Sequence, residues 1–305
     1  MKNEILITHY YNNYRPKVFL TRLHAKDYHC YLMYTYNYDQ ELENFAQTFL
    51  KYLPYYVRNS DYFDSIDDDQ DLDSQLETRS RSLRKNSKII PHRTIASDGI
   101  YGELFLDFYL RIVNKYNAII TYANKRSFDS NNETTGPDNL VYYVDENNVI
   151  NLCICEAKFL AGASAAHKGL IEDIVGTETK QGHITKEYLN NYIQFVVEKG
   201  CNILEKDRLI FKSFISSLNK MLDKGNDFIS ILIQHNIRVN FIFFAIFDSQ
   251  KNTPDKLLEY YSDIYSQCNS SASALGINNY TIEVVFIPTR NKTMILKQEM
   301  EKSYE

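Results

Sequence analysis

Two acidic residues and a lysine stand at positions that suit metal-dependent hydrolysis. Pro137-Asp138 precedes Glu156-Ala157-Lys158, and the latter ends the apolar run Leu152-Cys153-Ile154-Cys155. Residues two apart on a strand share a face, so Glu156 and Lys158 are expected to point the same way. A charged pair at the end of a buried strand is costly to desolvate unless it is paired or binds a metal. These residues are therefore candidates for a functional site.

The chemistry expected of this group is phosphodiester hydrolysis. Asp138 opens the preceding strand, so antiparallel pairing can bring it beside Glu156, and Glu103 on an earlier helix could supply a third carboxylate. Converging carboxylates repel one another without a cation. Mg²⁺ suits such oxygen ligands, and Mn²⁺ can substitute for it. A metal-bound water is then the nucleophile, while Lys158 positions that water or stabilises developing charge.

Each motif has a second copy that its context argues against. Glu178-Thr179-Lys180 lies in a polar stretch between two glycines with no strand around it, and Pro254-Asp255 looks like a helix start. His167 and His183 are the histidines nearest the candidate site, and each is interpreted as a surface or helix-face residue.

The elements around these motifs predict an α/β fold in which helices flank a mixed sheet. Apolar residues at strand or helix spacing mark most elements, and a crossover helix between the last two strands implies that they are parallel. The expected elements are strands at 18–23 and 28–36, a helix at 40–53, a helix at 101–116, strands at 118–122, 140–144 and 149–159, helices at 164–175, 184–198 and 204–224, a strand at 237–247, a helix at 255–268 and a strand at 281–287.

The register of the central hairpin decides whether Asp138 and Glu156 can share a metal. If all four residues 145–148 formed the loop, Asp138 would face Cys155 and point away from Glu156. A shared site requires Asp138 opposite Glu156, with Asp145 opposite Val149 or an equivalent bulge. Asn147 or Asn148 at positive φ can produce that turn.

Charge is distributed unevenly along the 305 residues, whose formal net charge is −5. Seven aspartates and no Lys or Arg lie between Asp61 and Asp73, and a basic segment without acids follows. We expect a small α/β unit at 1–60, a charged linker at 61–90 and the main domain at 91–305. The basic segment is either a solvated linker or surface helix, or an arm that contacts phosphates or a partner. Its candidate nucleic-acid-binding residues are Arg79, Arg81, Arg84, Lys85 and Lys88.

Several classes of protein are disfavoured by what the sequence lacks. It has no secretory signal or membrane-length apolar run and no phosphate-binding G-x-x-x-x-G-K-[ST] loop. Five scattered cysteines form neither a disulfide framework nor a zinc set, and Cys153 and Cys155 are expected to be buried. The sequence thus predicts a soluble, reduced, cytoplasmic protein.

The order and context of the motifs resemble the PD-(D/E)xK nuclease superfamily, whose core is a restriction-endonuclease-like αβββαβ fold. More narrowly, Tyr101-Gly102-Glu103-Leu104, Gly136-Pro137-Asp138-Asn139 and Cys155-Glu156-Ala157-Lys158-Phe159 resemble the HamA family, the nuclease subunits of the bacterial Hachiman anti-phage defence system. The resemblance makes 91–305 a nuclease-like domain. It implies metal ligands at Asp138 and Glu156, a catalytic lysine at Lys158 and a helix acid at Glu103.

Two functional hypotheses follow from this resemblance. The first is a Mg²⁺-dependent deoxyribonuclease that degrades DNA together with a HamB-like helicase subunit, in the bacterial cytoplasm. The alternative is a catalytically inactive nuclease-like fold that serves as a docking or sensing subunit of a complex. The net charge of −5 departs from what a self-sufficient DNA binder shows. A partner that binds the DNA would account for this difference.

Overall fold

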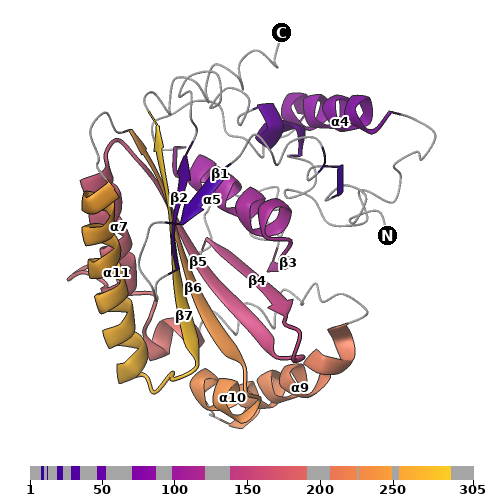
Figure 1. Ribbon diagram of the computed structural model, residues 1–305. Coiled ribbons are helices and arrows are strands. Elements are labelled where there is room, and N and C mark those ends of the chain that lie inside the picture. The colour runs from indigo at the N-terminus through magenta and orange to yellow at the C-terminus, as the bar shows by residue number, and fades with distance from the viewer. Residues whose placement is uncertain are drawn as a thin grey trace.

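The computed structural model describes most of the region around the predicted site. Described are residues 8–9, 12, 19–22, 29–34, 47–52, 71–86, 98–120, 138–190, 207–224, 227–248 and 254–289. These residues form an α/β fold in which helices flank both faces of a mixed sheet (Figure 1). This is the predicted fold class, and it is consistent with a restriction-endonuclease-like core.

The sheet has seven strands in the order β1-β2-β7-β6-β5-β4-β3. Three neighbouring pairs are parallel: β2–β7, β7–β6 and β6–β5. The other three pairs are antiparallel: β1–β2, β3–β4 and β4–β5. The parallel pairing of β6 with β7 across a helix confirms the predicted crossover. The strands are β1 (Phe19–Arg22), β2 (His29–Tyr34), β3 (Asn117–Ile120), β4 (Asn139–Val144), β5 (Ile150–Leu160), β6 (Arg238–Asp248) and β7 (Tyr280–Thr289).

The two faces of the sheet carry separate hydrophobic cores. On one face α4 (Leu72–Asn86) and α5 (Asp98–Phe108) pack with residues 49–52 and with the odd-numbered positions 153–159 of β5. On the other, α7 (Ala163–Val175), α9 (Arg208–Lys224), α10 (Phe228–Gln234) and α11 (Pro254–Ala274) pack with Leu152 and Ile154. Figure 1 shows α7 and α11 on the side of the sheet away from α5. Odd-numbered residues of β5 therefore contact the layer of α4 and α5, and even-numbered residues contact the opposite layer.

The helix predicted over 101–116 changes its winding partway. It begins at Asp98 and continues after Phe108 as a π-helical turn, η4 (Tyr109–Val113). The Tyr109 hydroxyl donates to the Glu283 carboxylate of β7 at 2.7 Å. Burial raises the pKa of Glu283 to about 7, although the hydrogen bond from Tyr109 opposes the shift.

The order α5-β3-β4-β5-α7-β6 matches the αβββαβ order expected of the core.

The hairpin between β4 and β5 has the register that a shared site requires. Asn139 pairs with Cys155 and Val144 with Ile150, so Asp138 comes opposite Glu156. The Asp145 backbone N–H donates to the Val149 carbonyl at 3.1 Å, which leaves a three-residue loop with Asn148 at φ +60°. The predicted pairing and turn are confirmed, and the further expectation that the Asp138 and Glu156 carboxylates both reach one Mg²⁺ stays a prediction.

The first two strands are part of the main sheet. β1 and β2 extend the same sheet, because β2 pairs with β7 and covers an edge that would otherwise be unpaired. Residues 72–86, within the expected linker, form α4, and Asp71 accepts bonds from the Ser74 N–H and hydroxyl at its start. Most of the aspartate cluster 61–73 lies outside the described residues, so the boundaries at 60 and 90 stay predictions.

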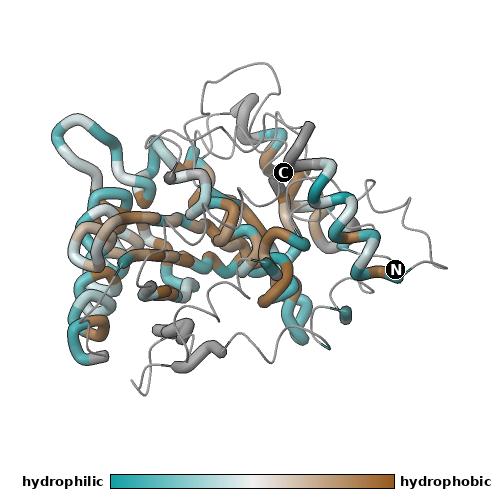
Figure 2. The backbone as a smooth tube through the Cα atoms, turned by 90° about the horizontal axis from the view of Figure 1, so that it is seen from above, coloured by the Kyte–Doolittle hydropathy of each residue, from teal (hydrophilic) through white to brown (hydrophobic). Residues whose placement is uncertain are grey.

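Hydrophobic residues concentrate in the middle of the molecule. Figure 2 shows the most hydrophobic stretches of backbone running through the interior, where the central strands lie. Cys153 and Cys155 of β5 are fully buried free thiols, as predicted. Within the described ranges, no helix combines the length and apolar character needed to cross a bilayer.

Candidate active site

Strand β5 places Glu156 and Lys158 on the face covered by α7. Their neighbours of the same parity, Leu152 and Ile154, belong to the α7 core, whereas Cys155 and Ala157 face α5. Glu156 is only 3% exposed. The expectation that this acid and lysine share one face of a buried strand is confirmed.

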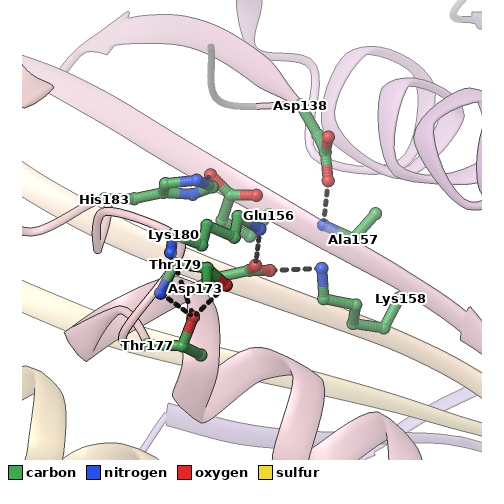
Figure 3. A network of polar contacts seen from close by, with 9 residues as sticks. All are labelled: Asp138, Glu156, Ala157, Lys158, Asp173, Thr177, Thr179, Lys180 and His183. Carbon is green, nitrogen blue, oxygen red and sulfur yellow. Dashed lines mark hydrogen bonds and ion pairs between the residues drawn. The ribbon is translucent and has the colours of Figure 1, made fainter. Parts of the chain in front are cut away.

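Asp173, in the last turn of α7, is held between two lysines (Figure 3). Lys158 forms an ion pair with its Oδ2. Lys180 donates from Nζ to its Oδ1 at 2.6 Å. The Asp173 side chain is 1% exposed, that of Lys158 22% and that of Lys180 51%, so the first lysine is partly buried and the second is at the surface.

The stem of Lys158 reaches Asp173 by crossing α7 at a glycine. A Cβ on Gly169 would lie 3.2 Å from the Lys158 Cε and 3.3 Å from its Cδ. Burial by itself lowers the pKa of Lys158, but the charge of Asp173 and its hydrogen bond outweigh that effect and hold the pKa above the ordinary value. Lys158 is therefore a fixed cation at neutral pH.

The loop after α7 folds back on the helix and delivers two more polar side chains. Gly176, at φ +84°, and Gly182 approach so closely that a Cβ on Gly182 would lie 2.5 Å from the Val175 carbonyl carbon. The Thr177 N–H donates to the Lys180 carbonyl at 2.7 Å, which closes the loop. Without a glycine at both positions, backbone would collide with side chain. This fold-back carries Lys180 and the following histidine to the site.

His183 lies against Glu156 inside the protein. Its Nδ1 contacts the Glu156 Oε1, and its backbone N–H donates to the Asp173 carbonyl at 2.6 Å. The ring stacks on Tyr188 with centroids 4.2 Å apart. Burial lowers the pKa of His183 to about 4, so the imidazole is neutral at pH 7. The interpretation of His183 as a surface residue is wrong, because the loop turns it inward.

Asp138 lies next to this group at the start of β4. One of its carboxylate oxygens, Oδ2, accepts a hydrogen bond from the Ala157 N–H at 2.6 Å, as Figure 3 shows. The bond fixes Asp138 at the level of Glu156 on the neighbouring strand. Its role as a metal ligand stays a prediction.

Three side chains have the geometry to hold a divalent cation. One donor atom from each of Glu156, Asp173 and His183 lies within 4.8 Å of the others. Donors around an octahedral ion with bonds of about 2.1 Å are about 3 to 4.2 Å apart, so a small contraction suffices. Two carboxylates and a neutral imidazole are a chemically suitable donor set. Among the described residues Asp138 does not belong to this group of three.

Glu103 and the basic segment lie in the opposite helical layer. Glu103 is on α5, whose adjoining Gly102 packs on the Ala157 and Phe159 side chains from the other face of β5. Arg79 and Arg81 are on α4, and Arg81 pairs with Glu77 one turn away at 3.2 Å. The side chains of Arg84 and Lys85, and all of Lys88, lie outside the described residues. The functional roles of all these residues stay predictions.

Sequence reasoning missed three of the six polar side chains that meet here, namely Asp173, Lys180 and His183. Asp173 resembles any polar residue of an amphipathic helix. Lys180 belongs to the second E-x-K motif, which lies in a polar stretch with no strand around it. The available signal was the pair Gly176 and Gly182 around a short polar stretch, which marks a close backbone approach.

Comparison with known proteins gives one family. The family model described as HamA matches residues 11–303, which is nearly the whole chain. Comparison with curated proteins gives no match.

Proposed function

This chain belongs to the HamA family of anti-phage defence proteins, and on that premise we propose that it is a metal-dependent DNA nuclease. The nuclease centre comprises Glu156 and Lys158 with the surrounding acids, and Asp138 and Glu103 remain candidates for it. A HamB-like helicase is the proposed partner that brings DNA to the site. The ion would be Mg²⁺ or Mn²⁺.

One observation carries the proposal: an acid and a lysine share one face of a buried strand, and two further metal-binding side chains converge on them. A purely structural strand end would bury apolar residues, because burying several charges costs more than it returns. Here Glu156 and Asp173 are almost fully buried beside two lysines and a histidine. Such a concentration of ionisable groups is typical of functional sites.

The residues divide the work of hydrolysis between them. A divalent cation, when bound, would polarise a phosphoryl oxygen and lower the pKa of a bound water. Lys158 stays protonated, so its ammonium is suited to stabilise the negative charge that develops on the phosphorane rather than to accept a proton. Without the ion, the carboxylates of Asp138, Glu156 and Asp173 outnumber the two lysines by one charge, and binding a divalent ion makes the centre positive and attractive to a phosphodiester.

Substitution of the strand residues tests the assignment. Glu156→Gln and Lys158→Ala should each abolish plasmid cleavage in Mg²⁺ or Mn²⁺, by at least about a hundredfold, while thermal unfolding remains cooperative. Glu178→Gln, in the exposed second E-x-K motif, and Lys168→Ala, on the exposed face of α7, are matched controls that should keep full activity. Cleavage is measured with the chain alone and with its co-expressed partner.

Two results would contradict the proposal. Full cleavage by Glu156→Gln would show that the activity arises elsewhere. No cleavage by the unaltered chain, with or without its partner and with either ion, would favour the inactive docking or sensing subunit instead.

A further inference from the structure

We infer that the ion of this centre is held by two carboxylates and one imidazole, from Glu156, Asp173 and His183, and that the centre prefers Mn²⁺ to Mg²⁺. The inference deepens the proposed function and rests on it for the use of the ion. It departs from the ligand pair expected from the sequence, because His183 and Asp173 are added and Asp138 serves another purpose.

The three donors come from three separate elements that the fold brings together. Glu156 is on β5, which is paired on both sides, and Asp173 is in the last turn of α7. His183 is tied to Asp173 through the backbone bond of 2.6 Å between its N–H and the Asp173 carbonyl. A site with ligands fixed in this way needs little rearrangement to accept an ion.

One carboxylate oxygen of Asp138 is engaged with the backbone of β5. Its Oδ2 accepts the Ala157 N–H at 2.6 Å. That bond holds β4 against β5 beside Glu156, which is a positioning role. The three donors that lie within 4.8 Å of one another do not include it.

The imidazole nitrogen selects among divalent ions. Mg²⁺ favours oxygen ligands, is strict about octahedral geometry and gives up water reluctantly. Nitrogen ligands suit first-row transition metals better than they suit Mg²⁺, and Mn²⁺ is a member of that series that binds carboxylates and water as Mg²⁺ does. Three protein ligands leave about three positions of an octahedron for water and phosphate oxygens.

Each donor is now engaged with a group that ion binding would displace. The Glu156 carboxylate contacts His183, and the Asp173 carboxylate contacts Lys158 and Lys180. An ion-pair network that never binds metal is the competing explanation for the same contacts. The two explanations differ in whether Mn²⁺ bound to the protein touches a histidine nitrogen.

Electron paramagnetic resonance of bound Mn²⁺ answers that question directly. The purified full chain, free of any histidine tag, is titrated with Mn²⁺, and electron spin echo modulation is recorded on the bound ion. We expect ¹⁴N modulation that changes to ¹⁵N modulation when the protein is grown with ¹⁵N-histidine. This measurement needs no substitution, so it does not depend on any variant folding.

Variants then assign the nitrogen. His183→Asn should remove the modulation and weaken Mn²⁺ binding by about tenfold or more, whereas His167→Asn, on α7 and paired with Asp263, should do neither. Asp173→Asn should weaken binding but keep the nitrogen signal. Mg²⁺ should displace Mn²⁺ only in about tenfold or greater excess, and that excess should shrink in His183→Asn.

The outcomes separate this inference from the proposed function. Bound Mn²⁺ without histidine modulation, or nitrogen modulation that survives His183→Asn, overturns the ligand set even if DNA is cleaved. Absence of Mn²⁺ binding overturns it too and supports the ion-pair network. Histidine-bound Mn²⁺ in a chain that cleaves no DNA supports the inference and contradicts the proposed nuclease function.

Discussion

Lys180 should oppose metal binding, and its removal should therefore strengthen it. In the structure Lys180 donates to the Asp173 Oδ1 at 2.6 Å, so an ion that uses Asp173 must first displace this ammonium. Lys180→Ala removes the competitor and leaves the carboxylate in place. We expect Mn²⁺ to bind more tightly to the variant than to the unaltered chain.

The magnitude follows from how exposed the two partners are. Hydrogen bonds to charged groups contribute about 1.5–3 kcal/mol when shielded, and fully exposed ion pairs about 0.2–1 kcal/mol. The Asp173 side chain is 1% exposed but that of Lys180 is 51% exposed, so the pair lies between these limits. A cost of about 1–2 kcal/mol corresponds to roughly a five- to thirtyfold gain in Mn²⁺ affinity.

Isothermal titration and the loss of the free Mn²⁺ resonance signal both measure this affinity. Lys168→Ala is the matched control, since Lys168 is 78% exposed on α7 and its partner Glu172 is not in the metal-binding group. The control should shift affinity less than twofold. Unchanged or weaker binding by Lys180→Ala would refute the reasoning, because it would mean that the ion does not compete for Asp173.

Two further predictions concern other parts of the molecule. Glu283 has its pKa raised to about 7 from 4.5 by burial, so the folded state holds a proton that the unfolded state has lost between these values. Stability should therefore fall as pH rises through this window, by about 2 kcal/mol for a partly exposed side chain. Urea unfolding of Glu283→Gln should lack that part of the decline, while the exposed Glu146→Gln should keep it; equal slopes in both would show that Glu283 is not the group responsible. Neutralising the basic segment should weaken DNA binding and flatten the dependence of that binding on salt concentration. The residues to replace are Arg79, Arg81, Arg84, Lys85 and Lys88. An unchanged salt dependence would favour a solvated surface instead.

The parts of the site that lie on one hairpin were predictable from the sequence. Strand alternation predicted the common face of Glu156 and Lys158, and the parity argument identified which of two registers a shared site requires, with Asp138 opposite Glu156. Both follow from the period of two in a strand and involve residues close in sequence. The turn at Asn148 was predictable for the same reason, since Asn tolerates positive φ.

The missed parts depend on contacts that no local pattern reveals. Lys180 and His183 enter the site only because Gly176 and Gly182 let the chain double back on α7. The pairing of β2 with β7 joins segments from opposite ends of the chain, so nothing near either strand indicates it. The change to a π-helical turn at Tyr109 is also invisible to an apolar pattern that fits one continuous helix.

The double-back after α7 divides the centre into two parts with different opening free energies. β5 is hydrogen-bonded to β6 over residues 151–160 and to β4 over residues 150–155, so most of its amide protons should exchange only when the sheet itself opens. The loop carrying Lys180 and His183 is tied to α7 by backbone bonds at its ends rather than by a strand on each side, so we expect it to open at a lower free energy than the sheet. Such an opening removes the imidazole and the outer lysine while Glu156 and Lys158 keep their places. The centre would then lose and regain His183 and Lys180 while the rest of the protein stays folded.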